Sequence, residues 1–191
     1  YLLRLGWGHG DAEIISREQA VEWFDIGAVG RSPARFDIKK LENLNAHYLR
    51  EADDARLASL AEDRVARLLG RALTAADQAQ LVTAMPSLKV RARTLLEIAD
   101  GAMFLFAMPA EMEGKARELI DGAPEGLLAE MAGSLAALPD WTMETLEAHV
   151  RAAAETRELG LGKVAQPLRA ALTGRAVSPG IFDVLFLLGR E

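Results

Sequence analysis

Apolar residues recur at helical spacing along almost all of this chain, and no other feature limits its fold as strongly. Ile38, Leu41, Leu44 and Tyr48, for example, fall on one side of a helix that turns about 100° per residue. Short alternating runs rich in Val, Ile and Thr, the pattern of strands, are absent from the sequence. The sequence therefore predicts an all-α fold.

Local signals mark where the helices begin. Ser16 and Gln19 form a capping-box pattern that opens a helix running to about Asp25. Asp37, Thr74 and Thr142 are placed to cap later helices, because each precedes an apolar stripe of helical period. Residues 27–36, which contain Gly and Pro, are expected to form a loop.

Proline and glycine mark further boundaries. Pro86 is expected to end one helix, so that the next begins near Ser87 and buries a stripe made of Leu88, Ala92, Leu95 and Ala99. A helix over residues 164–172 should end at Gly174. Ser178 as N-cap and Pro179 as first helical residue then open the last helix.

The charge is unevenly distributed. The chain has 22 Lys and Arg against 28 Asp and Glu, a net charge of −6, and its acidic excess lies mainly between residues 101 and 150. Two stretches without any carboxylate, called here the basic islands, carry Lys89, Arg91 and Arg93 (residues 86–96) and Lys163, Arg169 and Arg175 (residues 160–182). They keep a nucleic-acid partner open despite the acidic average, although ordinary solvated helix faces explain them as well.

Most other chemistry is excluded. The chain has no Cys and only three scattered His, so disulfides, thiolate nucleophiles and a metal centre are not expected. We find no catalytic constellation, and the segment around Gly160 and Lys163 departs from the phosphate-loop pattern. Neither a membrane span of about 18 to 20 apolar residues nor an export leader is present, so we expect a cytoplasmic protein without a membrane partner.

Two arginines in the islands are placed to bind a ligand. On a helical wheel Arg169 projects with Gln166 and Thr173 from the side opposite the apolar stripe, close to the free N–H groups of the last helix. Arg91 lies at the border of its buried stripe. The alternatives are a plain surface arginine for Arg169 and an ion-paired arginine for Arg91. Phe182, Phe186 and Leu187 are expected in the core.

Several motifs together resemble the C-terminal part of bacterial glutamyl-tRNA synthetases. The most specific are KVAQPLRAALTG at residues 163–174, SPGIFDVL at 178–185 and LLG at 187–189. YLLRLGW at 1–7, RARTL at 91–95 and FLF at 104–106 support the resemblance, as do Phe36, Lys40 and Asn45. It covers essentially the whole chain, and between residues 107 and 142 it depends on helix content.

The resemblance implies a division of the chain and a role for each part. Residues 1–49 would be a small helical stem-contact unit, followed by an α-helical cage that binds the anticodon in two parts, 50–107 and 108–191. Arg91 would contact the third anticodon base. The first two bases would be held by Arg169, Ser178, Pro179, Ile181 and Phe182, and Lys39, Lys40 and Asn43 are candidates for stem contacts.

The same resemblance limits what this piece does alone. The chain reads as a fragment that lacks the family's catalytic domain, so it should have no catalytic residue, metal or cofactor, while the longer enzyme would use ATP and magnesium. The partner would be tRNA for glutamate, with tRNA for glutamine left open, rather than DNA, and a monomer is expected. Asn43 stands where the family usually has Trp, which affects the first unit only.

Two alternatives remain from the sequence. One is the related helical cage of class I lysyl-tRNA synthetases, against which the signature from Gln166 to Gly180 argues. The other is a helical protein-interaction module that works through its acidic surface between residues 101 and 150.

Overall fold

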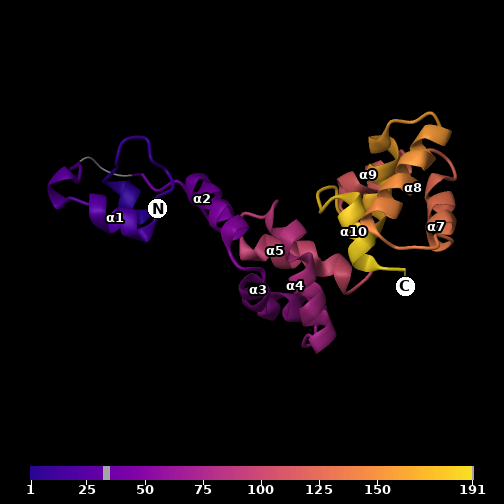
Figure 1. Ribbon diagram of the computed structural model, residues 1–191, viewed down its shortest axis with the longest axis horizontal. Helices are drawn as coiled ribbons and strands as arrows, with labels where there is room; N and C mark the ends of the chain where they lie inside the picture. The colour runs from indigo at the N-terminus through magenta and orange to yellow at the C-terminus, as the bar shows by residue number, and fades with distance from the viewer. Residues whose placement is uncertain (32–34, 191) are drawn as a thin grey trace.

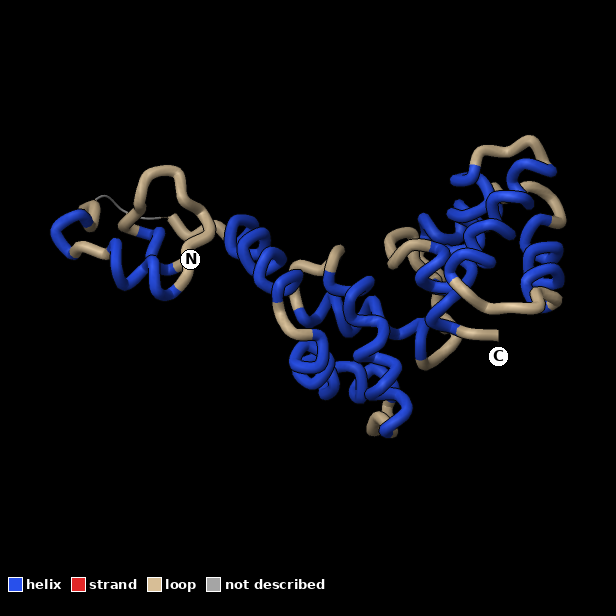
Figure 2. Tube along the Cα trace, in the orientation of Figure 1, coloured by secondary structure: helices blue, strands red, loops and turns tan. Residues whose placement is uncertain are grey.

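The computed structural model describes residues 1–31 and 35–190, and every regular element in them is helical (Figure 1; Figure 2). The predicted all-α fold is confirmed. Three groups of helices follow one another along an elongated molecule (Figure 1). Part of the predicted loop, residues 32–34, lies outside the described residues. In the described part, no helix combines the length and the apolar character needed to cross a membrane.

The first group is small and consists of η1 (Leu2–Leu5), α1 (Arg17–Trp23) and η2 (Ile26–Ala28). The predicted capping box is confirmed, because Ser16 Oγ accepts from Gln19 N while the Gln19 side chain accepts from Ser16 N. The ring of His9 stacks on that of Trp23 at 4.3 Å between centroids and on that of Trp7 at 6.3 Å. The group is thus held by aromatic stacking and turns rather than by helix packing.

The second group contains α2 (Ile38–Glu51), α3 (Asp54–Leu69), α4 (Ala75–Lys89), α5 (Leu95–Ala102) and η3 (Met103–Leu105). The predicted caps Asp37 and Thr74 are confirmed, since their side chains accept from Lys40 N and Asp77 N. Its apolar side chains form a first core, which includes Leu57, Val65, Leu81, Met85 and Ile98. α2 leads from the first group to this core (Figure 1).

The third group contains α6 (Gly114–Asp121), α7 (Leu127–Ala136), α8 (Met143–Thr156), α9 (Leu161–Thr173) and α10 (Ile181–Leu188). Its second core includes Leu127, Met131, Leu146, Val150 and Val164. Thr142 caps α8 as predicted, with its hydroxyl accepting from Thr145 N.

The last helix belongs to both cores. Ile181 and Leu185 lie in the second core, while Val184, fully buried, lies in the first. The backbone of α10 is also bonded from both sides, because Leu187 O accepts from Gln80 Nε2 at 3.2 Å and Leu185 O from Trp141 Nε1 at 3.0 Å. α10 therefore fixes the two cores relative to each other. The division at residues 49/50 and 107/108 stays a prediction.

Pro86 does not end a helix, so the prediction of a new helix from Ser87 is wrong. α4 runs through Pro86 to Lys89, and α5 begins only after Thr94, whose hydroxyl accepts from Glu97 N. An internal proline costs about 3 kcal/mol locally. Burial of Met85 and Leu88 in the first core, on either side of the proline, offsets this cost.

The ends of α9 and α10 also differ from the expectation. α9 ends at Gly174 as predicted, in a left-handed conformation with φ +69°, but it begins at Leu161 rather than at residue 164. α10 begins at Ile181 with Gly180 as its N-cap, two residues beyond the predicted Ser178. Ser178 and Pro179 are instead buried in the loop before α10, where the Ser178 hydroxyl donates to Pro179 O.

Candidate nucleic-acid interface

Three of the six basic side chains in the basic islands are paired with carboxylates from other segments of the chain. Lys89 pairs with Asp54 at 2.7 Å, Arg175 with Glu113 at 3.0 Å, and Arg93 lies 3.8 Å from Glu42. Within residues 1–31 and 35–190, the other three side chains, Arg91, Arg169 and Lys163, form no ion pair. The charge that remains available to a ligand is therefore concentrated on the two arginines that the sequence singles out and on Lys163.

Arg91 lies in the turn between α4 and α5, not on a helix, and its exposed side chain borders two adjoining cavities. The larger cavity, of about 540 Å³, is lined mainly by α4 and α10, including Pro86, Asp183 and Phe186. The smaller one, of about 150 Å³, is lined by Ser178 and Pro179 among others. Residues of both basic islands thus meet around the side chain of Arg91.

Arg169 lies close to this site but is tied to the protein. Its Nη2 donates to Ala176 O at 3.0 Å, and its buried Nε has no partner among the described residues. Burial, together with the positive charge of Arg91, lowers the pKa of the Arg169 guanidinium below its usual value. A guanidinium stays charged at neutral pH, so these two arginines, which form no ion pair among the described residues, can attract phosphate or carbonyl oxygens.

The prediction that Thr173 projects into solvent beside Arg169 is wrong. Thr173 is buried, and its hydroxyl donates to Arg169 O at 2.8 Å and accepts from Arg175 N at 3.3 Å. The helical wheel fails here because α9 ends at the next residue and the chain folds back over the last turn. Thr173 thus shapes the loop of residues 175–180, called here the recognition loop.

The remaining anticodon candidates are divided between the cavity and the core. Ser178 and Pro179 line the smaller cavity next to Arg91. Ile181 lies in the second core and Phe182 packs against it, so neither lines the two cavities around Arg91. The candidate stem residues Lys39, Lys40 and Asn43 are exposed on α2 and line neither cavity.

Among the lining residues of the larger cavity that were not predicted from the sequence, two carry side chains that can contact a base. Phe186, expected in the core, has 44% of its surface exposed and borders the cavity, so its ring is available for stacking. Asp183 lies in the first turn of α10, and a Cβ built on Gly180 would be 2.9 Å from its Oδ2. A carboxylate at this helix N-terminus disfavours a phosphate there and accepts from a base amino group instead. The sequence predicted that this helix starts at Pro179, which would put Asp183 beyond its first turn, so no local signal identified Asp183.

The side chains around Arg91 are of the kinds that bind nucleotides. It offers a guanidinium fork, an exposed aromatic ring and a carboxylate around one hollow, which are the groups that hold unstacked bases. No cluster of three His, Asp or Glu side chains that could hold a metal occurs among residues 1–31 and 35–190.

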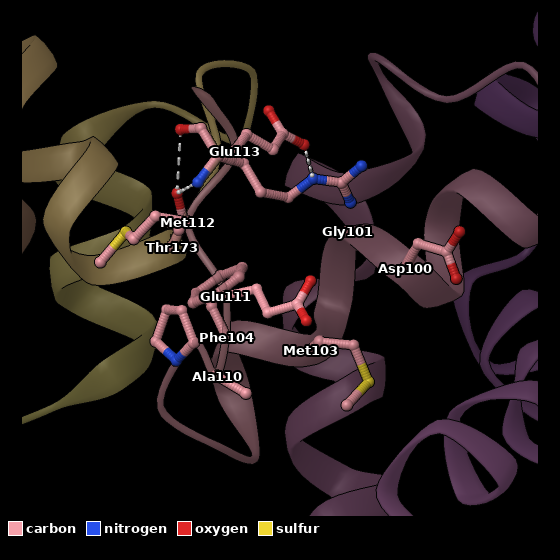
Figure 3. A pocket seen from close by; sticks show the side chains of 12 residues that line it. Asp100, Gly101, Met103, Phe104, Ala110, Glu111, Met112, Glu113 and Thr173 are labelled. Atoms are coloured by element: carbon pink, nitrogen blue, oxygen red, sulfur yellow. Dashed lines mark hydrogen bonds and ion pairs between the residues drawn. The ribbon is translucent and has the colours of Figure 1, made fainter. Parts of the chain in front are cut away.

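A third cavity, of about 320 Å³, lies where the chain crosses between the two cores. It is lined by η3, by the linker of residues 109–113 and by the end of α9 (Figure 3). Figure 3 shows the carboxylate of Glu111 directed into this hollow and Glu113 bonded at its edge. Gly101 and Arg175 line both this cavity and the smaller cavity beside Arg91, so the two cavities share a wall.

Comparison with known proteins gives consistent results. The family described as "Anticodon binding domain" matches residues 39–191. "Glutamate--tRNA ligase 1" of Sphingopyxis alaskensis is 68% identical over the whole chain, and "Glutamate--tRNA ligase 2" of Rhizorhabdus wittichii is 63% identical. The chain spans 40% of the length of each of these curated relatives. The crystal structure of a glutamate-tRNA synthetase from Elizabethkingia anophelis matches 97% of the chain at a TM-score of 0.77 and 26% identity, over 36% of its own length.

Proposed function

Because this chain belongs to the anticodon-binding domain family, we propose that it is the tRNA-recognition part of a glutamate–tRNA ligase. The longer protein would join glutamate to tRNA at the expense of ATP, with magnesium, in the cytoplasm. This chain would supply binding and orientation. The relatives and the solved structure quoted above all carry the glutamate name, so a lysyl-tRNA synthetase cage or a protein-interaction module is not favoured.

The observation that carries the proposal is the meeting of Arg91 with Ser178 and Pro179 around one cavity. These residues are far apart in the sequence and come from two different helix groups. Sequence-specific RNA recognition requires unstacked bases whose edges are read by arginine forks and backbone groups. A site assembled from two segments is suited to bind several bases, since each segment can read a different base.

Within this proposal the roles are divided between the segments. Arg91 reads the third anticodon base. Arg169 and the recognition loop, with Ser178 and Pro179, hold the first two bases, and Ile181 and Phe182 support that loop from the core. Two guanidinium groups that form no ion pair among the described residues and the exposed ring of Phe186 support this assignment.

The stem of the tRNA would contact α2. Lys39, Lys40 and Asn43 are exposed there without a side-chain partner among the described residues. Asn45 Nδ2 donates to Arg93 O at 2.6 Å, which ties α2 to the turn that holds Arg91. Stem and anticodon contacts would therefore keep a fixed relation to each other. These lysines would contribute mainly salt-dependent, sequence-independent affinity.

The experiment is a binding titration of the 191-residue chain with transcripts of a bacterial tRNA for glutamate. Three further transcripts each carry one changed anticodon base. We expect Arg91→Ala to remove about 1 to 3 kcal/mol of discrimination at the third base, the size of a bidentate base contact. Arg56→Ala, which removes an exposed arginine of α3 that forms no ion pair among the described residues, is the matched control.

Equal losses for every anticodon would mean that Arg91 contacts only phosphate. A wild-type chain that binds all four transcripts equally would overturn the proposed function itself.

A further inference from the structure

The recognition loop needs an anchor, because its tip is exposed. Val177 has 67% of its surface exposed, while the two residues after it are buried. One hydrogen bond to the loop comes from α9, where Arg169 Nη2 donates to Ala176 O. The other side of the loop is bonded to Glu113, the N-cap residue of α6 in the same helix group.

Glu113 uses both carboxylate oxygens on the loop. Its Oε1 accepts from Arg175 Nε at 3.0 Å and its Oε2 accepts from Ala176 N at 3.2 Å. One carboxylate thus holds a side chain and the neighbouring backbone N–H at the same time, which fixes the direction in which the loop leaves α9. Figure 3 draws the bond from Glu113 at the edge of the third cavity, whereas no bond is drawn to the carboxylate of Glu111.

The backbone of the same linker is locked to the same place. Glu113 N donates to Gly174 O at 2.9 Å. A Cβ built on Gly174 would lie 2.6 Å from Pro109 Cβ and 2.9 Å from Glu111 O, so the linker and the end of α9 are in the closest contact that a glycine allows. The backbone of Glu113 is therefore held in place, which in turn limits where its carboxylate can lie.

Two features indicate that this bond serves geometry more than stability. Glu113 is the N-cap residue of α6, yet its side chain makes no capping bond and turns to the loop instead. The side chains of Glu113 and Arg175 are 47% and 39% exposed, and exposed ion pairs contribute only about 0 to 1 kcal/mol. A pair this exposed stabilises the fold little, but it directs the chain that leads to Ser178 and Pro179.

We propose that Glu113 is a positioning residue for base recognition. It touches no nucleotide; it holds Arg175 and Ala176 so that the recognition loop presents Ser178 and Pro179 beside Arg91. This inference rests on the proposed function. It goes further by assigning a specificity role to an acidic residue of the linker, outside both basic islands. Because Arg91 stands on a separate turn, its contact with the third base does not depend on Glu113.

The test compares Glu113→Ala and Glu111→Ala in the whole 191-residue chain, with the four transcripts described above. Glu111→Ala removes the same charge from the same linker, and the Glu111 side chain forms no hydrogen bond or ion pair among the described residues, so it controls for electrostatic attraction of RNA. We expect Glu113→Ala to lower discrimination at the first two bases about tenfold, the scale of a small misplacement of binding groups. Discrimination at the third base should change less than about twofold, because Arg91 is unaffected.

Glu113→Gln provides the conservative variant. Its amide oxygen still accepts from Ala176 N, but the ion pair with Arg175 is lost, so discrimination should fall between those of wild type and Glu113→Ala. Thermal melting followed by circular dichroism shows whether Glu113→Ala folds. If it does not, Glu113→Gln alone tests the positioning role.

The outcomes separate the two proposals. If Glu113→Ala weakened binding equally for all four transcripts, or had the same effect as Glu111→Ala, the positioning role would be overturned. The proposed function would still stand, provided that the wild-type chain discriminates between the transcripts. Unchanged discrimination in both Glu113 variants would overturn it as well. Loss of wild-type discrimination altogether would overturn the proposed function and this inference with it.

Discussion

The first helix group and the rest of the molecule are built in different ways. Within residues 1–31 and 35–37, Trp7 is the one hydrophobic side chain that is buried, whereas Leu2, Val21 and Ile26 are each at least 75% exposed. From α2 onward, two cores contain many side chains without any accessible surface, such as Met85 and Leu146. The comparison teaches that helical periodicity alone does not produce a core.

The physical reason is the area that each part removes from water. Burial of a large apolar side chain contributes about 1.5 to 3 kcal/mol, and the first group contains little of it. Its order comes instead from ring stacking and from local bonds such as the one from Gly30 N to Gly6 O. We therefore expect the first group to open locally well before the two cores unfold.

The largest effect is expected in the second core. Leu146→Ala removes a fully buried side chain and should lower the free energy of unfolding by about 2 to 5 kcal/mol, because a cavity remains. Urea denaturation followed by circular dichroism measures it. Leu2→Ala, at a 75% exposed position of the first group, is the control and should change the main transition little. Comparable losses from both changes would contradict the comparison.

Gly174→Ala tests the joint between the two cores. The left-handed φ of +69° costs a residue with a Cβ about 1 to 2 kcal/mol, and the clash with Pro109 and Glu111 O adds to this. Gly70 has the same φ but open space around it, so Gly70→Ala should show the backbone cost alone. We expect Gly174→Ala to exceed Gly70→Ala by about 1 to 3 kcal/mol, the range for overpacking. Equal losses would mean that the linker moves away freely.

Trp7→Ala should have a small effect on the main unfolding transition, about 0.5 kcal/mol or less, although Trp7 is 6% exposed and contacts Phe24 and His9. Its effect should appear in amide hydrogen exchange, which we expect to accelerate within residues 1–31 and not in the two cores. If Trp7→Ala instead lowered the main transition as much as Leu146→Ala, the first group would be part of the cooperative unit.

The smallest effect concerns pH and an exposed cap of α4. Hydrogen bonds from Arg71 and from Thr74 hold the pKa of Asp77 well below its usual range. A lowered pKa in the folded state stabilises the protein above the unfolded pKa of about 4, and this contribution is lost as the pH falls further. Asp77→Asn should therefore destabilise slightly at pH 7 and less at pH 3, measured by denaturation at both pH values. The α1 cap, formed by Ser16 and Gln19, has no titrating group and should show no such dependence.

Features that depend on neighbours in the chain could be predicted from the sequence. The caps at Ser16, Asp37, Thr74 and Thr142 were correct, because a capping bond joins residues three apart. The end of α9 at Gly174 was also predicted correctly, because a glycine that ends a helix is a local signal. The all-helical fold also followed from a local period.

Features that depend on distant residues could not be predicted in this way. Pro86 stays inside α4 because its neighbours Met85 and Leu88 are buried against other helices, which compensates the local cost. Lys89 and Arg175 looked free in the sequence, and their partners Asp54 and Glu113 come from other segments. Phe186 looked like a core residue because periodicity cannot tell which side of an apolar helix meets a cavity.

The sharing of α10 between the two cores has a consequence for the order of synthesis. Residues 49–105 leave the ribosome long before Val184, which completes the core they form. The second core likewise lacks Ile181 and Leu185 until the same stretch has been translated. Domains generally fold as their chain emerges, so we expect each core to be completed only when residues 181–188 arrive and to leave an apolar surface uncovered until then.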